Sequence, residues 1–147
     1  MQKNLVVTKP MDDFRFEIFD DVNNPHYTFY KLYIEDKCFF DEFLEEEVTG
    51  TPEEKDYNSI ISMMDYFSPQ IQLPKKKFRH IEWSERDDLF EFKKNQMRVY
   101  VVKQGDIIYI VMGGWKKNQK LDISKFKKRI KRSSALNQQI KKKLKKT

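Results

Sequence analysis

Basic side chains flank the turns in the second half of the chain. Lys93 closes the segment LFEFK, and Arg98 opens the segment MRVYVV. A hairpin turn between the two segments would set these two residues side by side. A guanidinium clamps phosphate through paired hydrogen bonds, and a lysine among other cations has a lowered pKa and can accept a proton. The expected chemistry is phosphate binding by Arg98 with proton transfer by Lys93 or Lys117. Three further lysines are expected to hold a phosphate backbone, namely Lys94, Lys116 and Lys120.

The segment GGWKKNQK (residues 113–120) contains two of the four glycines in the chain. We expect Gly113 and Gly114 to let the chain leave the sheet sharply and to bring backbone N–H groups close to a phosphate. Trp115 is expected to stack on a splayed base, as in single-stranded RNA recognition. The alternative is that the two glycines only relieve a strand end and that Trp115 caps the core.

The charge is divided unevenly along the chain. Residues 115–147 hold 14 Lys and Arg and a single acid, Asp122, which gives a net charge of +13. The first 114 residues carry a net charge of −7. A basic end on an acidic body indicates a polyanionic partner for that end.

The composition also disfavours several classes of protein. No apolar run approaches the roughly 18 residues of a membrane span, and the N-terminal apolar stretch is too short for a signal peptide, so we expect a cytoplasmic protein without a membrane partner. Cys38 is the only cysteine, and the two histidines, His26 and His80, are far apart in the sequence, so no metal or cofactor is expected. Cys38 is predicted to fill the core, and His80 to have a structural role.

The first half of the chain shows two strand patterns followed by two helix patterns. Residues 14–19 and 26–34 are predicted to pair as a hairpin, and residues 38–47 to form a short helix. Thr51 is the predicted N-cap of a second helix, with Pro52 at its first position and Glu54 closing a capping box.

The second half begins with residues 71–88, which are predicted to be irregular. Three meandering strands follow, with a tight turn at Gly105, and a basic helix then opens near Asp122 or Ser124 with Phe126 and Ile130 on its apolar face. Glu91 is expected either to orient Lys93 or Arg98 or to be solvated. The predicted strands are residues 89–94, 97–103 and 107–112.

This order of elements predicts an α+β fold in which two N-terminal helices pack on one face of an antiparallel sheet. An extra N-terminal strand or hairpin and a basic C-terminal helix complete the prediction. The chain is long enough for one ordinary core, so a single domain over residues 1–147 is expected. Its core spans about 29–132, and a basic tail covers about 133–147. The spacing of Leu136, Ile140 and Leu144 predicts that the helix resumes in this tail.

Two stretches resemble the RelE/ParE superfamily of toxins from toxin–antitoxin systems, in its HigB-like, phage-derived branch. YKLYIEDKCFFDEFLEE is similar to the family's first strand and first helix. In LFEFKKNQMRVYVVKQGDIIYIVMGGWKKNQK, the piece LFEFK is similar to the branch's LxELR strand, and GDIIYIVMGGWKKNQK to GxxIVLLHGFxKKTQK. The resemblance covers roughly residues 29–132.

The resemblance implies a RelE-like fold whose sheet cradles RNA. It implies a ribosome-dependent mRNA endoribonuclease, with mRNA on the ribosome, ribosomal RNA and a cognate antitoxin protein as partners. Cleavage in such enzymes needs no metal, because the ribose 2′-OH attacks the adjacent phosphate. The ParE side of the superfamily instead inhibits DNA gyrase without cutting nucleic acid.

The sequence departs from the family pattern at three places. The arginine of LxELR is Lys93, the HGF corner is GGW and has no histidine, and the tyrosine that RelE places near its C-terminus has no counterpart after Lys120. The missing histidine and tyrosine keep an inactive nucleic-acid-binding relic of the fold as an alternative, beside the non-catalytic gyrase inhibitor that the ParE side implies.

Overall fold

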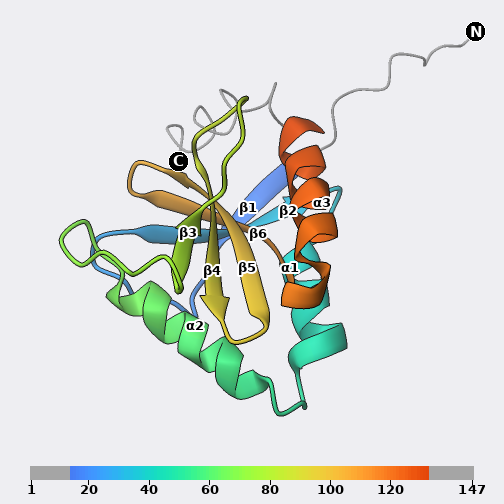
Figure 1. Ribbon diagram of the computed structural model, residues 1–147, viewed down its shortest axis with the longest axis horizontal. Coiled ribbons are helices and arrows are strands. Elements are labelled where there is room, and N and C mark those ends of the chain that lie inside the picture. Colours follow the sequence, from blue (N-terminus) through green and yellow to red (C-terminus); the bar gives the residue numbers. More distant parts are fainter. Residues whose placement is uncertain (1–13, 133–147) are drawn as a thin grey trace, which may run out of the picture.

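A computed structural model describes residues 14–132 as a six-stranded sheet with helices on both faces (Figure 1). The strand order in the sheet is β1-β2-β6-β5-β4-β3. The strands are β1 (Phe14–Ile18), β2 (Thr28–Ile34), β3 (Phe78–His80), β4 (Leu89–Lys94), β5 (Met97–Gln104) and β6 (Ile107–Trp115). The helices are α1 (Phe39–Phe43), the π-helix η2 (Leu44–Val48), α2 (Glu54–Tyr66), the 3-10 helix η3 (Lys116–Asn118) and α3 (Gln119–Arg132).

The sheet is mixed, which corrects the prediction of an antiparallel sheet. β1 and β2 form the predicted antiparallel hairpin, and β3 to β6 form an antiparallel meander. β2 and β6 pair in parallel, with Thr28 opposite Ile107 and Lys31 opposite Ile110. The helices between β2 and β3 carry the chain across the sheet, so the last strand of the meander returns beside the first hairpin. The predicted α+β class is confirmed.

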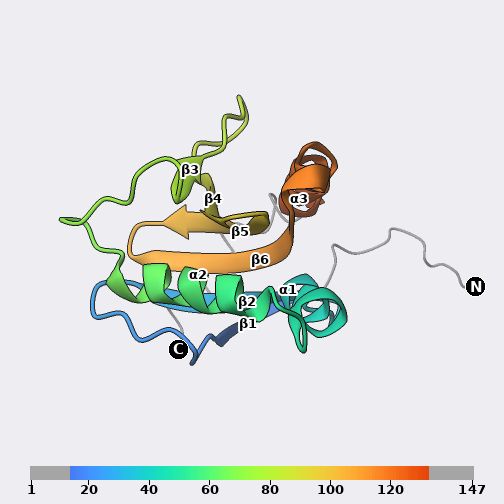
Figure 2. The ribbon, with the colours of Figure 1, turned by 60° about the horizontal axis from the view of Figure 1, so that its bottom comes forward.

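The helices lie on opposite faces of the sheet (Figure 2). Phe40 of α1 and Met64 of α2 are buried in one apolar cluster, whereas Phe126 and Ile130 of α3 are buried in another. The prediction that the two N-terminal helices share one face is therefore confirmed, and α3, for which no face was predicted, covers the other. Both faces of the central strands are apolar, so both need a cover. The two predicted apolar residues of the basic helix provide it on the second face.

The predicted helix after Thr51 is confirmed as α2, but it begins later than predicted. Thr51 Oγ1 accepts a hydrogen bond from Glu53 N at 3.2 Å, and the Glu54 carboxylate accepts one from Gly50 N. The predicted capping box would use the backbone N–H groups of Glu54 and Thr51. The observed bonds use those of Glu53 and Gly50, one residue earlier in each case. Pro52 lies in the turn that leads into α2 rather than at its first position.

The meander contains two tight turns and one bulge. Asn95 and Gly105 occupy the turns with φ of +51° and +62°, which confirms the predicted tight turn at Gly105. The register shifts between Tyr100 and Val101, where Tyr100 faces Met112 and Val101 faces Ile110. Val111 is therefore the extra residue of a β-bulge.

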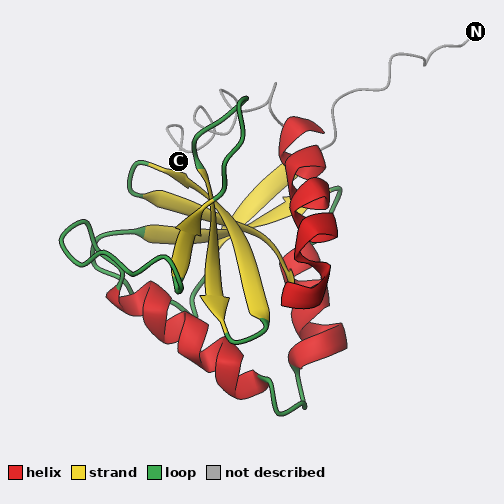
Figure 3. Cartoon of the chain, in the orientation of Figure 1, coloured by secondary structure: helices red, strands yellow, loops and turns green. Residues whose placement is uncertain are grey.

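The segment predicted to be irregular contains the short edge strand β3. Figure 3 shows β3 between two long loops, one from α2 and one to β4. Phe78 pairs with Phe92, Arg79 with Glu91 and His80 with Phe90. Three paired residues are too few for an alternating pattern to be visible in the sequence.

The predicted continuation of the basic helix beyond residue 132, and the whole basic tail, lie outside the described residues. Within residues 14–132, no helix is both long enough and apolar enough to cross a membrane. Cys38 is buried in the core at 5% exposure, as predicted.

Candidate phosphate-binding site

Lys93 and Arg98 are register partners across the β4–β5 hairpin, so the predicted juxtaposition is confirmed. Gly114 of β6 faces Arg98 from the other side. Arg98 alternates with Met97 and Val99, which belong to the core cluster beneath α1 and α2, and therefore lies on the α3 face of the sheet. By the same alternation Lys93 lies on the α3 face.

A buried carboxylate lies next to this pair. Glu91 is 0% exposed and accepts hydrogen bonds from the guanidinium of Arg79 on β3. Gln119, the first residue of α3, donates from Nε2 to both carboxylate oxygens of Glu91, at 2.9 and 3.1 Å. Glu91 is therefore neither solvated nor hydrogen-bonded to Lys93 or Arg98. It joins the edge strand to the start of α3. We call Arg79, Glu91, Lys93, Arg98 and Gln119 the polar cluster.

Arg98 is almost fully buried, and its observed hydrogen bonds are internal. The residue is 6% exposed, and its Nη1 donates to the carbonyl oxygens of Asn95 at 2.8 Å and Met97 at 2.9 Å. These bonds hold the β4–β5 turn. Arg98 Nε is buried and has no hydrogen-bond partner among the described residues. A buried donor without an acceptor is costly, and a phosphate oxygen is the kind of acceptor that it lacks.

Lys93 is half-buried and has a lowered pKa. Burial is the largest cause, because it disfavours the ammonium form. The positive charges of Arg79, Arg98 and Lys116 lower the pKa further, and the negative charge of Glu91 opposes them. The net shift is in the direction that favours acceptance of a proton by Lys93.

Tyr100 lies two residues after Arg98 on β5, so its side chain is also on the α3 face, and its hydroxyl lies near the polar cluster. Its side chain is 0% exposed, and the hydroxyl has no hydrogen-bond partner in the part of the chain that the structure describes. Burial raises the pKa of Tyr100, and the carboxylates of Glu91 and Asp122 act in the same direction. The hydroxyl therefore stays protonated and can donate a hydrogen bond.

The other predicted lysines do not all join this cluster. Lys116 is exposed and acts on the pKa of Lys93, and its backbone N–H donates to Gln96 O at 2.6 Å. Lys117 is exposed and lines a shallow pocket with Trp115. Lys120 is exposed in the first turn of α3. Lys94 follows Lys93 on the strand, and its side chain therefore points to the α2 face.

The two glycines lie inside β6 rather than where the chain leaves the sheet. Gly113 pairs with Val99 and Gly114 with Arg98, and neither has a positive φ. A Cβ at Gly113 would lie closer than 3.0 Å to the ring of Phe43. A Cβ at Gly114 would overlap a carboxylate oxygen of Asp122. The expectation of a sharp exit from the sheet is wrong, and the glycines make room for one side chain on each face.

Trp115 packs against the core on the α1 side. Its ring lies 5.1 Å from that of Phe43 in an edge-to-face arrangement, and its indole N–H donates to Glu47 Oε1 at 2.7 Å. Register also places Trp115 opposite Met97, on the face away from Arg98. These contacts are those expected of a residue that caps the core.

Sequence reasoning missed three residues of the site, namely Arg79, Gln119 and Tyr100. Arg79 lies on a strand that the sequence did not reveal, and no pattern distinguishes Gln119 from the polar and basic residues around it. For Tyr100 a signal exists, because it is two residues from Arg98 on a strand and must share its face. His80 bonds the carbonyl oxygen of Asp87 through Nε2 at 2.8 Å.

Comparison of the chain with models of protein families, with curated proteins and with solved structures finds no match. Within residues 14–132, no group of three or more His, Cys, Asp or Glu side chains is placed to hold a metal ion. The polar cluster is therefore the feature of the molecule that points to a function.

Proposed function

We propose that the protein has a RelE-like fold and is the toxin of a toxin–antitoxin system, an endoribonuclease that cuts mRNA on the ribosome. The observation that carries this proposal is the pairing of Lys93, whose pKa is lowered, with Arg98, whose buried Nε has no partner among the described residues. One group can accept a proton and the other can bind a phosphoryl oxygen. Cleavage by an internal ribose hydroxyl needs both.

The reaction follows from these two groups. The neutral amine of Lys93 takes the proton of the ribose 2′-OH as its oxygen attacks the adjacent phosphorus. The bond from phosphorus to the 5′-oxygen breaks, which leaves a 2′,3′-cyclic phosphate and a 5′-hydroxyl. Arg98 and Lys116 stabilise the negative charge on the phosphoryl oxygens. The leaving oxygen takes a proton from water or from an ammonium group of the loop at Lys116 and Lys117.

The charge distribution supports an RNA partner. η3 and the first turn of α3 present Lys116, Lys117 and Lys120 beside the polar cluster, in the segment whose net charge is strongly positive. Clustered lysines bind the phosphate backbone without reading sequence. In this proposal they contact mRNA and ribosomal RNA, and an antitoxin protein holds the toxin inactive.

Primer extension on an abundant transcript after induced expression tests the proposal. We expect cuts only on translated message, and we expect Lys93→Met to abolish them. Lys55→Met serves as the matched control, because Lys55 is an exposed lysine on α2, on the opposite side of the sheet. In a reconstituted reaction, the rate should rise with pH and level off below the ordinary lysine pKa of 10.5, because deprotonated Lys93 is the base.

The other outcomes separate the alternatives. Growth arrest without cuts, unchanged by Lys93→Met, would contradict the nuclease and favour a gyrase inhibitor, which supercoiling assays would then test. The absence of both cuts and arrest would leave a nucleic-acid-binding protein that has lost catalysis. Arg98→Lys is a useful second variant, because it keeps the charge while removing Nε.

A further inference from the structure

An aromatic pocket opens beside the edge strand, on the α2 face of the sheet. Its volume is about 430 Å³. Four rings line it, those of Tyr27, Phe67, Phe78 and Phe90. Gln72 and Lys103 also line it, and Lys103 is the only charged residue among those that do. A pocket of this size can take a small planar ligand.

The rings of this pocket form two stacked pairs. Tyr27 and Phe67 lie 4.7 Å apart with planes 16° from parallel, and Phe78 and Phe90 lie 4.8 Å apart at 5°. Phe78 and Phe90 are half-buried, so part of their surface is open to a ligand. Lys103 Nζ lies 5.3 Å from the centre of the Tyr27 ring, which keeps a positive charge at the pocket. Flat rings beside a cation favour a planar, electron-rich group with a negative charge nearby.

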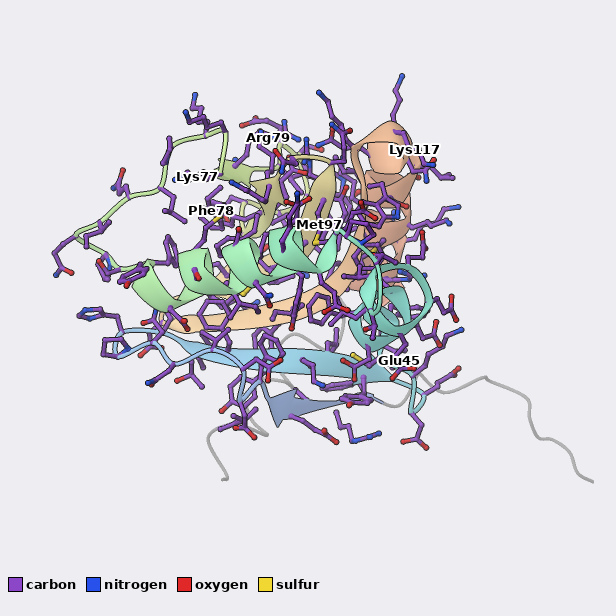
Figure 4. All side chains as sticks on the ribbon, turned by 90° about the horizontal axis from the view of Figure 1, so that it is seen from below. Glu45, Lys77, Phe78, Arg79, Met97 and Lys117 are labelled. Carbon is purple, nitrogen blue, oxygen red and sulfur yellow. The ribbon has the colours of Figure 1, made fainter. Side chains whose placement is uncertain are left out.

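The pocket and the polar cluster lie on the two sides of the same edge strand. Phe78 lines the pocket, and the next residue, Arg79, bonds Glu91 on the α3 face. Figure 4 shows Phe78 toward α2 and Arg79 toward the side of α3, with Lys77 beside them. The backbone N–H of Lys93 donates to Lys77 O at 2.8 Å, so the segment before β3 touches the strand end that carries Lys93.

Three exposed lysines precede β3 at the sheet edge. Lys75, Lys76 and Lys77 form a continuous basic run that leads directly into Phe78. A nucleic-acid strand that passes from the α3 face around β3 to the pocket would run along these lysines. β3 forms the edge of the sheet and has only three residues, so the RNA strand has a short path around this edge from one face to the other.

We propose that the aromatic pocket binds one unstacked base of the same RNA strand whose phosphate is held at Lys93 and Arg98. This inference rests on the proposed function and extends it with a second RNA contact a few nucleotides away. The base stacks on Phe78 and Phe90, and Lys75 to Lys77 neutralise the phosphates between the two sites. Stacking on aromatic side chains accepts any base, so the pocket positions the strand without reading its sequence.

Binding of short fluorescent oligoribonucleotides, each with one abasic nucleotide at a different position, tests the pocket directly. We expect one position, away from the clamped phosphate, at which loss of the base weakens binding about 5- to 100-fold. Gln72→Trp fills the pocket from its rim, and Lys103→Met removes its charge. Neither residue is part of the buried core, so thermal unfolding should show folded variants. In Gln72→Trp, the penalty at that abasic position should disappear.

Tyr66→Ala is the matched control, because Tyr66 is an aromatic residue next to Phe67 that is 74% exposed and does not line the pocket. It should keep the abasic penalty. Equal penalties at every position, or a penalty that Tyr66→Ala removes and Gln72→Trp does not, would overturn the proposal. Tight binding of free mononucleotides without any abasic penalty in a strand would also overturn it.

The two proposals fail separately. Translation-dependent cuts that require Lys93, combined with no abasic penalty, would keep the nuclease and reject the pocket. An abasic penalty that Gln72→Trp removes, without cuts in cells, would keep the pocket as an RNA contact and reject catalysis. Crosslinking of 4-thiouridine at the sensitive position should map to Tyr27, Phe78 or Phe90 in the wild type. A crosslink only at residues of the α3 face would contradict the path around β3.

Discussion

The two faces of the sheet are built differently. Toward α1 and α2, the buried strand residues are apolar, as in the run of Phe92, Val99 and Val101. Toward α3, the sheet buries Glu91 and Arg98 among its apolar residues. The face toward α1 and α2 shows that apolar residues alone can form the core of this fold. The face toward α3 contains charged groups that such a core does not require.

Burial of these groups has a cost that the structure does not fully offset. Arg98 Nε and the Tyr100 hydroxyl are buried and have no partner within the described residues. A buried donor left without an acceptor costs about 1–3 kcal/mol of stability. Most buried polar groups in proteins are satisfied, and among the described residues only Arg86 Nη1 shares this state, so two exceptions close together point to a ligand that supplies the acceptors.

The largest effect that would test this comparison comes from Arg79→Met. The substitution leaves the fully buried Glu91 carboxylate with Gln119 as its only remaining hydrogen-bond donor among those observed. Loss of one partner of a buried ion pair costs about 3–5 kcal/mol, and partial exposure of Arg79 places the expected loss near the lower end. Urea unfolding measures it. Lys77→Met, which replaces an exposed cation of the same segment, should change the free energy of unfolding little.

Arg79→Met combined with Glu91→Gln completes the test. The double variant buries no unpaired charge, so it should recover much of the stability lost in the single variant. If Arg79→Met costs less than about 1 kcal/mol, Glu91 is not the buried anion that the comparison of the two faces requires.

The sequence predicted the pairing of Lys93 with Arg98 because it depends only on a short turn between two adjacent strands. The partner of Arg98 on β6 could not be predicted in the same way. The bulge at Val111 shifts the register by one residue, which places Gly114 rather than Gly113 opposite Arg98. A bulge inserts one residue without a change in composition, so the alternation of apolar residues does not locate it.

The placement of α3 illustrates a second limit. The apolar residues Phe126 and Ile130 predicted a buried helix face, and both are buried. Their spacing does not tell which face of the sheet the helix covers, because β5 is buried on both faces. The parallel pairing of β2 with β6 is equally a property of the whole chain path. Contacts between distant segments decide both features, and local patterns contain little information on them.

Substitution of Gly113 or Gly114 is expected to have an intermediate effect on stability, and each substitution tests one face of the sheet. In Gly113→Ala, the new methyl group meets the buried ring of Phe43. Overpacking of this type costs typically about 1–3 kcal/mol. In Gly114→Ala, the methyl group meets the Asp122 carboxylate instead. Thermal or urea unfolding should show both variants to be destabilised.

The double variants separate the two faces. Asp122→Ala should rescue Gly114→Ala, because it removes the overlapping carboxylate. Phe43→Leu should not rescue Gly113→Ala to the same extent, because loss of the ring leaves a cavity in the core. Equal rescue in both pairs would mean that the two faces of the sheet are built alike.

The smallest expected change in stability is that of Tyr100→Phe. This variant tests most directly whether the buried polar groups of the α3 face lower the stability of the protein. Removal of a buried hydroxyl without a partner is expected to leave stability unchanged or to raise it by up to about 1 kcal/mol. Tyr57→Phe is the matched control, because the Tyr57 hydroxyl donates to Asp21 Oδ2 at 3.2 Å and its loss should lower stability slightly. Urea unfolding of both variants gives the sign of each change. A clear loss in Tyr100→Phe would show that its hydroxyl already has a structural role, and the case for a ligand-supplied acceptor would then depend on Arg98 alone.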